Sequence, residues 1–158
     1  MMLLKELLDK MRQMNLTLAS VESCTGGRVG AAITAISGAS DVYQGGVIAY
    51  QNRIKTELLG VNPKDIQHYD VVSRQVAEQM VKGACKLLKA NLGVATTGYA
   101  GPSSGNPDIP VGTIWIACGT KDEVLTKRLS LQFDRVRNLE IATEEVFNLL
   151  GSFLNDSL

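Results

Sequence analysis

The sequence predicts an α/β domain, a three-layer α/β/α sandwich with a mixed, mostly parallel central sheet and a late antiparallel hairpin. Strand-like and helix-like segments alternate early in the chain, as in βαβ units. Two strand-like segments then follow one another directly, which is typical of a hairpin. The 158 residues, 45% of them hydrophobic and 20% charged, suit a single domain over residues 1–158 that buries its own core.

The first third of the chain supplies two helices and two strands. Leucine and methionine at helical spacing predict a helix over residues 3–14, and the apolar run at 16–21 predicts a short strand. Residues 25–36 are rich in small residues and predict a helix, which the Ser-Gly-Ala-Ser segment at 37–40 ends. Residues 42–50 are typical of a strand with a glycine-weakened middle.

The middle of the chain repeats the alternation. A short helix is expected over 52–60, ended by its last glycine, and a turn over 61–65. The longest helix is predicted over 73–90, with a serine as its N-cap and an apolar side of valine, methionine and leucine. Residues 92–98 then have the unbroken apolar character of a buried strand.

A long Gly/Pro/Ser loop at 99–110 precedes the last elements. Strands over 111–120 and 123–133 form the expected hairpin, and a helix over 134–153 closes the fold. Ligands of such sheets bind beyond the carboxyl ends of the parallel strands. The turn after the first strand and this loop both lie at such ends, so both are candidate parts of a site.

Charge and cysteine content exclude several classes of function. The formal net charge is zero and no Lys/Arg block stands out, so no nucleic-acid partner is expected. Cys24, Cys85 and Cys118 lack CxxC spacing, and with the lone His68 they suit neither a metal site nor a disulfide framework. We therefore expect a reducing, cytoplasmic setting. No apolar run reaches the length of a signal-peptide core or a membrane span, so no membrane association is expected.

The turn "SCTGG" after the first strand is the strongest candidate for chemistry. Backbone N–H groups of Thr25, Gly26 and Gly27 are expected to be free first-turn donors of the next helix, which bind anions or an oxyanion. A hydroxyl beside them, that of Ser23, would suit acyl transfer. The alternative is a capped turn in which Ser23 or Thr25 is only an N-cap.

A serine nucleophile requires a base. His68 lies in "DIQHYD", which is typical of a surface loop, and its spacing supports no triad. A lysine serves as a base when burial lowers its pKa, and Lys55 follows a strand end shortly after Tyr50. Both side chains could point at the end of the sheet. Spacing alone, however, favours a surface helix lysine.

Cys24 is a rival nucleophile, because a helix N-terminus lowers the pKa of a thiol. Adjacent residues near a strand end point to opposite sides, so only one of Ser23 and Cys24 is expected to face a site. The alternative for Cys24 is a small buried hydrophobic residue. The residues themselves leave this choice open.

The loop at 99–110 is a second candidate, because long polar loops in compact domains are often functional. Gly98, Gly101 and Gly105 offer backbone donors for phosphate or ribose, although the spacing matches neither a Walker A loop nor GxGxxG. Arg135 or Arg137, at the start of the last helix, could bind a phosphate; ordinary solvated arginines are the alternative.

An ordered set of motifs resembles one known family. From about residue 3 to residue 150 the chain is similar to the CinA C-terminal domain family, the nicotinamide-nucleotide amidases, and it would be the stand-alone form without the N-terminal domain of larger members. The motifs that carry the resemblance are "ESCTGG", "GGVIAYQNRIKTELLGV", "VVSRQVAEQMVKGA", "TTGYAGPSSG" and "PVGTIWIA".

The resemblance implies an activity and the residues for it. The activity is hydrolysis of the carboxamide of nicotinamide mononucleotide to nicotinate mononucleotide and ammonia, in pyridine-nucleotide recycling. Ser23 would be the nucleophile, with Tyr50 and Lys55 as its base, because they match the family's "YSNxxK" segment. No metal or other cofactor is implied, and a homodimer is. The residues expected to hold the oxyanion, ribose and phosphate are Thr25, Gly26, Gly27, Thr97, Gly98, Gly101 and Arg135.

The chain departs from the family pattern at some positions. Gln51 replaces a common serine, Ile109 stands where lysine is common, and "FDR" replaces "GDR" before the last helix. A positive charge near the substrate phosphate is therefore in question. The altered loop supports one alternative, an amidase for another small amide. The family's link by name to competence and damage responses supports a second, a nucleotide-binding or regulatory module without turnover.

Overall fold

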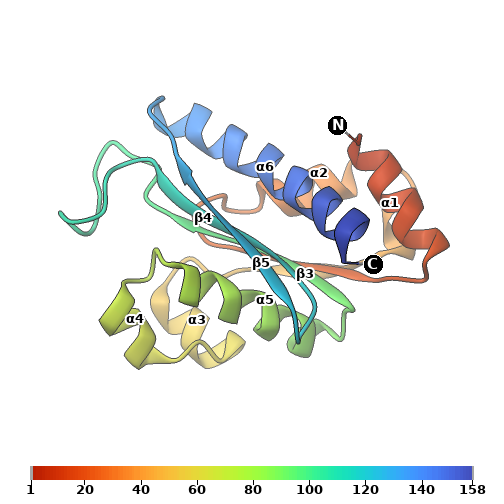
Figure 1. The fold of residues 1–158 in the computed structure, drawn as a ribbon, viewed down its shortest axis with the longest axis horizontal. Helices are drawn as coiled ribbons and strands as arrows, with labels where there is room; N and C mark the ends of the chain where they lie inside the picture. Colours follow the sequence, from red (N-terminus) through yellow and green to blue (C-terminus); the bar gives the residue numbers. More distant parts are fainter. Residues whose placement is uncertain (1, 158) are drawn as a thin grey trace.

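The computed structural model describes residues 2–157 and has three layers, with a twisted sheet between two layers of helices (Figure 1). The five-stranded sheet has the order β2-β1-β3-β4-β5. Its strands are β1 (Leu18–Glu22), β2 (Tyr43–Ile48), β3 (Leu92–Gly98), β4 (Thr113–Gly119) and β5 (Val124–Ser130).

Strand directions agree with the predicted mixed sheet. β1 pairs in parallel with both β2 and β3, whereas β3–β4 and β4–β5 are antiparallel. Only β4 therefore runs against the other strands. The predicted fold class is confirmed, including the late hairpin.

The helices divide between the two faces of the sheet (Figure 1). On one face lie α1 (Leu4–Gln13), α2 (Arg28–Thr34) and α6 (Arg135–Asp156). On the other lie α3 (Asn52–Leu59), α4 (Pro63–Tyr69) and α5 (Arg74–Leu88), and a short 3-10 helix, η1 (Ala39–Asp41), precedes β2. All five residues of β1 are buried, because this strand has neighbours on both sides and helices on both faces.

Two apolar clusters fill the space between the layers. Alternate residues of a strand point to opposite faces, so Leu18 joins the cluster under α1, α2 and α6, and Ala19 joins the one under α5. Phe153 of α6 is a fully buried side chain of the first cluster, and Met80 of α5 is one of the second. The clusters make the sheet a rigid support for the loops at its ends.

The turn expected at 61–65 and the loop expected around His68 are wrong, because α4 occupies residues 63–69, whereas the expected surface position of His68 is confirmed. Asn62 caps this helix by accepting the Lys64 N–H at 2.9 Å, and Pro63 is its first residue. Proline is favoured there, because its missing N–H would have no helical partner. The sequence thus contained an N-cap followed by proline, a helix start that was interpreted as a turn.

The helix expected over 25–36 begins later, at Arg28. Gly26 and Gly27 have φ values of 56° and 106°, which keep the chain out of the helix until it has turned. Residues 23–27 therefore form a separate turn at the carboxyl end of β1.

Candidate active site

A cavity of about 340 Å³ opens where β1 and β3 end. Its wall comes from both of these strand ends, from the start of α3, from the α4–α5 linker, from the loop after β3 and from the start of α6. The cavity is lined by Ser23, Cys24, Tyr50, Asn52, Lys55, Val71, Val72, Thr97, Gly98, Tyr99, Ala100, Ser103 and Arg135.

The structure brings most of the predicted site residues to this cavity and leaves others outside its lining. Those that line it are Ser23, Tyr50, Lys55, Thr97, Gly98 and Arg135. Thr25, Gly26 and Gly27 lie in the turn that follows Ser23. Gly101 is also outside the lining, and its carbonyl accepts from Arg135 Nη1 at 2.7 Å. The roles expected for these four residues stay predictions.

Ser23 is the first residue after β1. Its N–H donates to the carbonyl oxygen of Thr96 at 3.0 Å, so the parallel pairing of β1 with β3 continues one residue further and fixes its backbone. Among the residues described, its hydroxyl has no hydrogen-bond partner. A hydroxyl held by a rigid strand end and open to a cavity is available for reaction.

Lys55 is a buried lysine in the wall of the cavity. It lies on α3 and its relative exposure is 1%. Nζ donates to the carbonyl oxygen of Tyr50 at 3.2 Å, and no carboxylate within residues 2–157 forms an ion pair with it. Burial lowers the pKa of Lys55 to about 8, because desolvation disfavours the charged form. The surface position favoured by spacing alone is therefore wrong.

Tyr50 and Arg135 are joined at the rim. Arg135 Nη2 donates to the Tyr50 hydroxyl at 3.3 Å while Nη1 holds the Gly101 carbonyl. Arg135 is the first residue of α6, whose N-cap Asp134 accepts the Arg137 N–H at 2.9 Å. The guanidinium is thus fixed in orientation beside the cavity, and Tyr50 remains 56% exposed.

Cys24 borders the same cavity as Ser23, but it belongs to the apolar cluster under α1, α2 and α6, in agreement with the alternative of a small buried hydrophobic residue. Burial raises the pKa of the Cys24 thiol to about 11. A thiol with so high a pKa is protonated near neutral pH, and the thiolate is the nucleophilic form. These properties favour Ser23 as the nucleophile.

Glu22 is a polar residue of the site region that sequence reasoning missed. Its buried carboxylate accepts the Thr25 hydroxyl at 2.6 Å and the N–H groups of Val29 and Gly30 at 2.8 and 3.0 Å. The chain's own carboxylate thus satisfies first-turn donors of α2. Gly26 N–H donates to the Ser23 carbonyl at 3.2 Å, so the expectation that the Gly26 N–H is a free donor is wrong. An acidic residue ending an apolar strand, three residues before a threonine, was the available signal.

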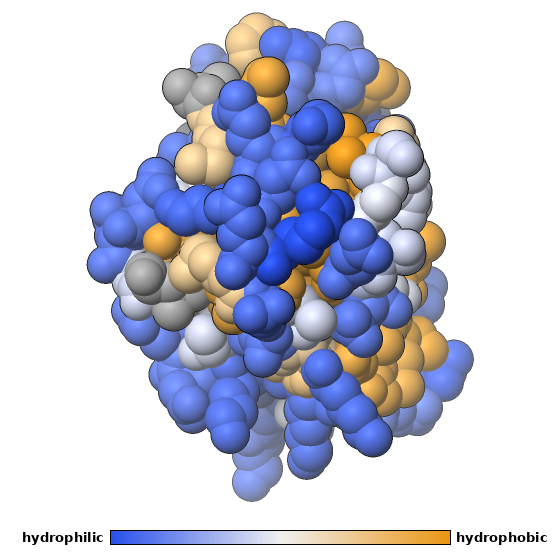
Figure 2. Space-filling model, turned by 90° about the vertical axis from the view of Figure 1, so that its right-hand side faces the viewer, coloured by the Kyte–Doolittle hydropathy of each residue, from blue (hydrophilic) through white to orange (hydrophobic). Residues whose placement is uncertain are grey.

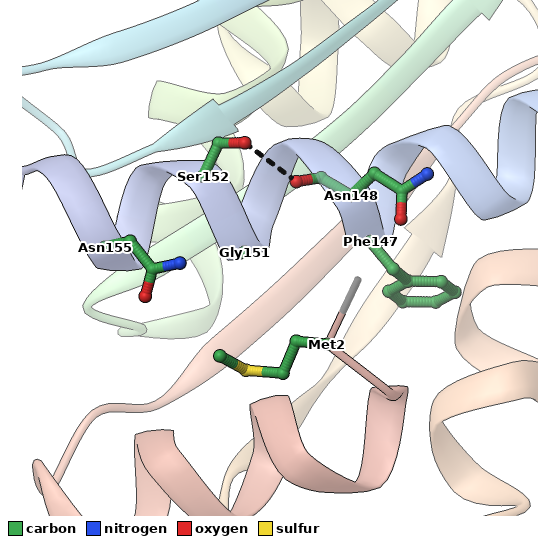
Figure 3. A pocket seen from close by; sticks show the side chains of 6 residues that line it. All are labelled: Met2, Phe147, Asn148, Gly151, Ser152 and Asn155. Carbon is green, nitrogen blue, oxygen red and sulfur yellow. Dashed lines mark hydrogen bonds between the residues drawn. The ribbon is translucent and has the colours of Figure 1, made fainter.

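A second cavity of about 350 Å³ lies beside α6 and is lined by no residue that ionises near neutral pH (Figure 3). Its lining is Met2, Phe147, Asn148, Gly151, Ser152 and Asn155. On the end of the molecule opposite the loop after β3, hydrophilic side chains cover most of the visible surface (Figure 2).

Within residues 2–157 the structure has neither a metal-binding cluster nor a membrane-spanning helix. No cluster of three or more His, Cys, Asp or Glu side chains is placed to hold a metal ion. None of the helices between residues 2 and 157 has the length and apolar character needed to cross a membrane.

Sequence comparison finds relatives over nearly the whole chain. A family model described as the CinA C-terminal domain matches residues 2–154. A CinA-like protein of Salinibacter ruber is 43% identical over 84% of this chain, and a putative competence-damage inducible protein of a Thermoanaerobacter species is 41% identical over 93%. The matches cover only 32% and 35% of those relatives, so the chain spans about one third of their length.

Solved structures are similar to this chain in fold over nearly its whole length. A competence-damaged protein (CinA) superfamily protein from Klebsiella pneumoniae has a TM-score of 0.91 at 27% identity, with 96% of each chain covered. A competence/damage inducible protein from Agrobacterium tumefaciens has a TM-score of 0.83 at 33% identity, with 98% of each chain covered.

Proposed function

The chain belongs to the CinA C-terminal domain family, and we propose that it is an amidohydrolase that converts nicotinamide mononucleotide to nicotinate mononucleotide and ammonia. One observation carries the proposal. Ser23 and the buried Lys55 line the same cavity, and within residues 2–157 the serine hydroxyl has no hydrogen-bond partner and the lysine pairs with no carboxylate. This is the pairing of nucleophile and base that acyl transfer requires.

In the proposed reaction Lys55 is the general base in its neutral form. Its amine accepts the proton of the Ser23 hydroxyl while Oγ bonds to the carboxamide carbon, and the carbonyl oxygen becomes an oxyanion. The resulting Lys55 ammonium returns the proton to the amide nitrogen as the carbon–nitrogen bond breaks. Ammonia leaves, and a nicotinoyl ester on Ser23 remains.

The second half of the reaction uses the same groups. Lys55 accepts a proton from water while the water oxygen bonds to the ester carbon. The proton then passes to Ser23 Oγ as the ester bond breaks, which gives the nicotinic acid group and restores the enzyme; the acid then releases its remaining proton to solvent, where the ammonia takes it up. Each step transfers one proton through one amine, so no metal or redox cofactor is required.

Tyr50 is proposed to position Lys55 and Arg135. Its carbonyl oxygen accepts from the Lys55 amine at 3.2 Å, and its hydroxyl accepts from Arg135 at 3.3 Å. A carbonyl acceptor orients the amine and leaves its lone pair free for the Ser23 proton. These contacts favour direct transfer from Ser23 to Lys55 over a relay through the Tyr50 hydroxyl.

Residues at the rim of the cavity are proposed to bind the substrate. Arg135 is the arginine of the cavity lining, and a fixed guanidinium suits a phosphate. Thr97, Gly98 and Gly101, at or beside the end of β3, would hold the ribose. The oxyanion would bind N–H groups of the turn that carries Ser23, where those of Thr25 and Gly27 donate to no residue within 2–157.

We also propose a cytoplasmic homodimer acting on a small-molecule nucleotide, without nucleic acid or membrane partners, as the family resemblance suggests. Sedimentation equilibrium would test the dimer. A nucleotide-binding module without turnover, or an amidase for another small amide, is the alternative. The departures from the family pattern in the loop after β3 support the second of these alternatives.

Ammonia release from nicotinamide mononucleotide tests the proposal. We expect the wild type and Cys24→Ala to release ammonia, and Ser23→Ala to lose about 10³-fold or more in kcat. Cys24→Ala is the matched control, because it alters the neighbouring residue of the same cavity. A wild type that binds the nucleotide, seen as thermal stabilisation, without releasing ammonia would contradict the proposal and favour the binding module.

A further inference from the structure

Asp70, in the linker between α4 and α5, has a backbone conformation that is unusual for its residue type. Its φ is 76° and its ψ is 157°, a region that glycine alone occupies without strain. Lys89 also has a positive φ, but its φ of 51° and ψ of 46° are those of an ordinary left-handed helix cap. Asp70 is therefore held in a strained conformation by the contacts around it.

The Asp70 carboxylate makes three hydrogen bonds that account for this conformation. Oδ2 accepts the Val72 N–H at 2.9 Å and the Tyr99 hydroxyl at 2.8 Å, and Oδ1 accepts from Asn106 Nδ2 at 3.3 Å. The first bond is local. The other two reach the loop that follows β3, so one carboxylate ties the α4–α5 linker to that loop.

Tyr99 lies at the base of the same loop and in the wall of the cavity. Its N–H donates to the Thr113 carbonyl at 3.0 Å, and its own carbonyl accepts the Gly112 N–H at 2.7 Å, so its backbone closes residues 99–112. A Cβ at Gly105 would lie 3.0 Å from Tyr99 Cε1, which shows that the tip of the loop folds back onto the ring.

The protonation state of Tyr99 suits this arrangement. Burial, reinforced by the Asp70 hydrogen bond and charge, raises the pKa of the Tyr99 hydroxyl well above its ordinary value. The phenol therefore keeps its proton and donates it to the carboxylate throughout the neutral range. The ring is fixed at one end by this bond and at its edge by Gly105.

We propose that Asp70 is a positioning residue for substrate binding: through Tyr99 and Asn106 it holds the 99–112 loop and fixes the Tyr99 ring as the surface on which the aromatic amide of the substrate packs. The inference rests on the proposed function for the identity of that amide. An aromatic ring attracts a planar ring, and attracts a pyridinium cation more strongly than a neutral one. Tyr99 would thus favour substrates whose amide is carried on a cationic ring.

The test compares variants that remove the carboxylate or the hydroxyl alone. Asp70→Gly relieves the backbone strain and removes the acceptor, so the fold is retained. Tyr99→Phe keeps the ring and removes the donor. Tyr69→Phe is the matched control, because Tyr69 is the exposed tyrosine beside Asp70.

We expect both variants to raise KM for nicotinamide mononucleotide roughly 3- to 10-fold with kcat within about 2-fold of wild type. The double variant should resemble Asp70→Gly, because both changes break the same bond. Asp70→Asn should recover part of the loss, because an amide oxygen still accepts the Tyr99 hydroxyl. Tyr69→Phe should match the wild type.

Amide hydrogen exchange of residues 100–111 in the free protein gives a readout that needs no substrate. We expect faster exchange in Asp70→Gly and Tyr99→Phe than in the wild type and Tyr69→Phe. Unchanged loop exchange would overturn the inference, and so would faster exchange with an unchanged KM. If the wild type releases no ammonia, the proposed function fails, whereas the exchange experiment still decides whether Asp70 holds the loop.

Discussion

The amine of Lys55 lies 3.2 Å from the carbonyl oxygen of Tyr50, and no carboxylate in the described part of the chain pairs with it. One neutral acceptor does not replace the hydration that a buried ammonium loses. The charged form is therefore disfavoured, and the neutral amine that a general base requires is accessible near neutral pH.

The pH profile of the proposed activity should follow Lys55. With a pKa of about 8, roughly one tenth of the amine is neutral at pH 7, so kcat/KM should rise with pH through about 8 and level off above it. Ammonia release between pH 6 and 10 measures this, with enzyme pre-incubated at each pH and assayed at pH 8 as the control for unfolding. A rate that falls between pH 7 and 9 would contradict a lysine base.

Replacing Lys55 with methionine should abolish activity and raise stability at pH 7. Below pH 8 the lysine is charged in both the folded and the unfolded state, so the folded state bears the cost of burying the charge. Between about 8 and 10.5 the unfolded state binds more protons, and the wild type gains stability as pH rises. The advantage of Lys55→Met should therefore be largest at low pH and shrink as the pH rises through this window.

Thermal unfolding measures this effect. In a domain of this size, each kcal/mol gained in the free energy of unfolding raises Tm by about 2–4 °C. Lys82→Met, at an exposed position on α5, is the control and should change neither activity nor Tm appreciably. A lower Tm for Lys55→Met at pH 7 would show that the lysine stabilises the fold, contrary to its burial with no counter-ion among residues 2–157.

The burial of Lys55 also shows where prediction from the sequence stops. Its neighbours on α3 are ordinary for a surface helix, and only the packing of α3 against α5 and the sheet encloses its side chain. By contrast, the helix expected over 73–90 and the strand over 92–98 agree closely with α5 and β3, because the helical segment carries an apolar stripe along its length and the strand segment is rich in small and apolar residues. Local pattern determines such elements, whereas tertiary contacts determine the pKa of one side chain.

The same distinction explains the other differences. The α4 helix has seven residues, none of them buried, so its sequence carries no apolar stripe to reveal it. The positions of Ser23 and Tyr50 at one cavity were predicted from strand ends and family motifs. The Glu22 contacts depend on how the chain turns after β1, which no periodicity encodes.

Glu22→Gln should destabilise the fold. Glutamine keeps one oxygen acceptor, but its NH₂ group replaces the second carboxylate oxygen. A backbone N–H that this oxygen accepts in the wild type would then face another donor. Leaving a buried donor unpaired costs about 1–3 kcal/mol. Urea unfolding should show a lower midpoint with an unchanged slope. Glu57→Gln, which breaks an exposed ion pair with Arg53, is the control and should cost less than about 1 kcal/mol; an equal loss in both would contradict a special role for Glu22.

Asn138 should be equally sensitive, because it joins α6 to the loop after β3. It is fully buried, and its Nδ2 donates to the carbonyl oxygens of Ala100 and Phe133, each at 3.0 Å. Asn138→Leu would leave these acceptors unpaired, at a cost of about 1–3 kcal/mol each where water cannot replace the amide. Urea unfolding measures the loss. Asn148→Leu, at a half-buried position on the same helix, should cost less; no difference between the two would contradict the assignment.

Arg135→Ala should weaken substrate binding specifically through the phosphate. The guanidinium is oriented by Gly101 and Tyr50, so its loss should raise KM for nicotinamide mononucleotide by about 10-fold or more, in the range of a charge-assisted pair. Arg137→Ala is the matched control: it lies two residues along α6, is half exposed and pairs with Glu140 at 3.2 Å.

Nicotinamide riboside lacks the phosphate. Assayed with Arg135→Ala, it distinguishes phosphate binding by Arg135 from support of the cavity wall by the same residue. If Arg135 binds the phosphate, kcat/KM for the riboside should be the same in wild type and Arg135→Ala, while that for the mononucleotide falls. An equal fall for both substrates would show that Arg135 acts instead through Tyr50 and the Gly101 carbonyl, as a support for the cavity wall. The phosphate would then require another cation. Since Ile109 stands where the family commonly has lysine, that cation would have to come from elsewhere on the rim or from a second subunit.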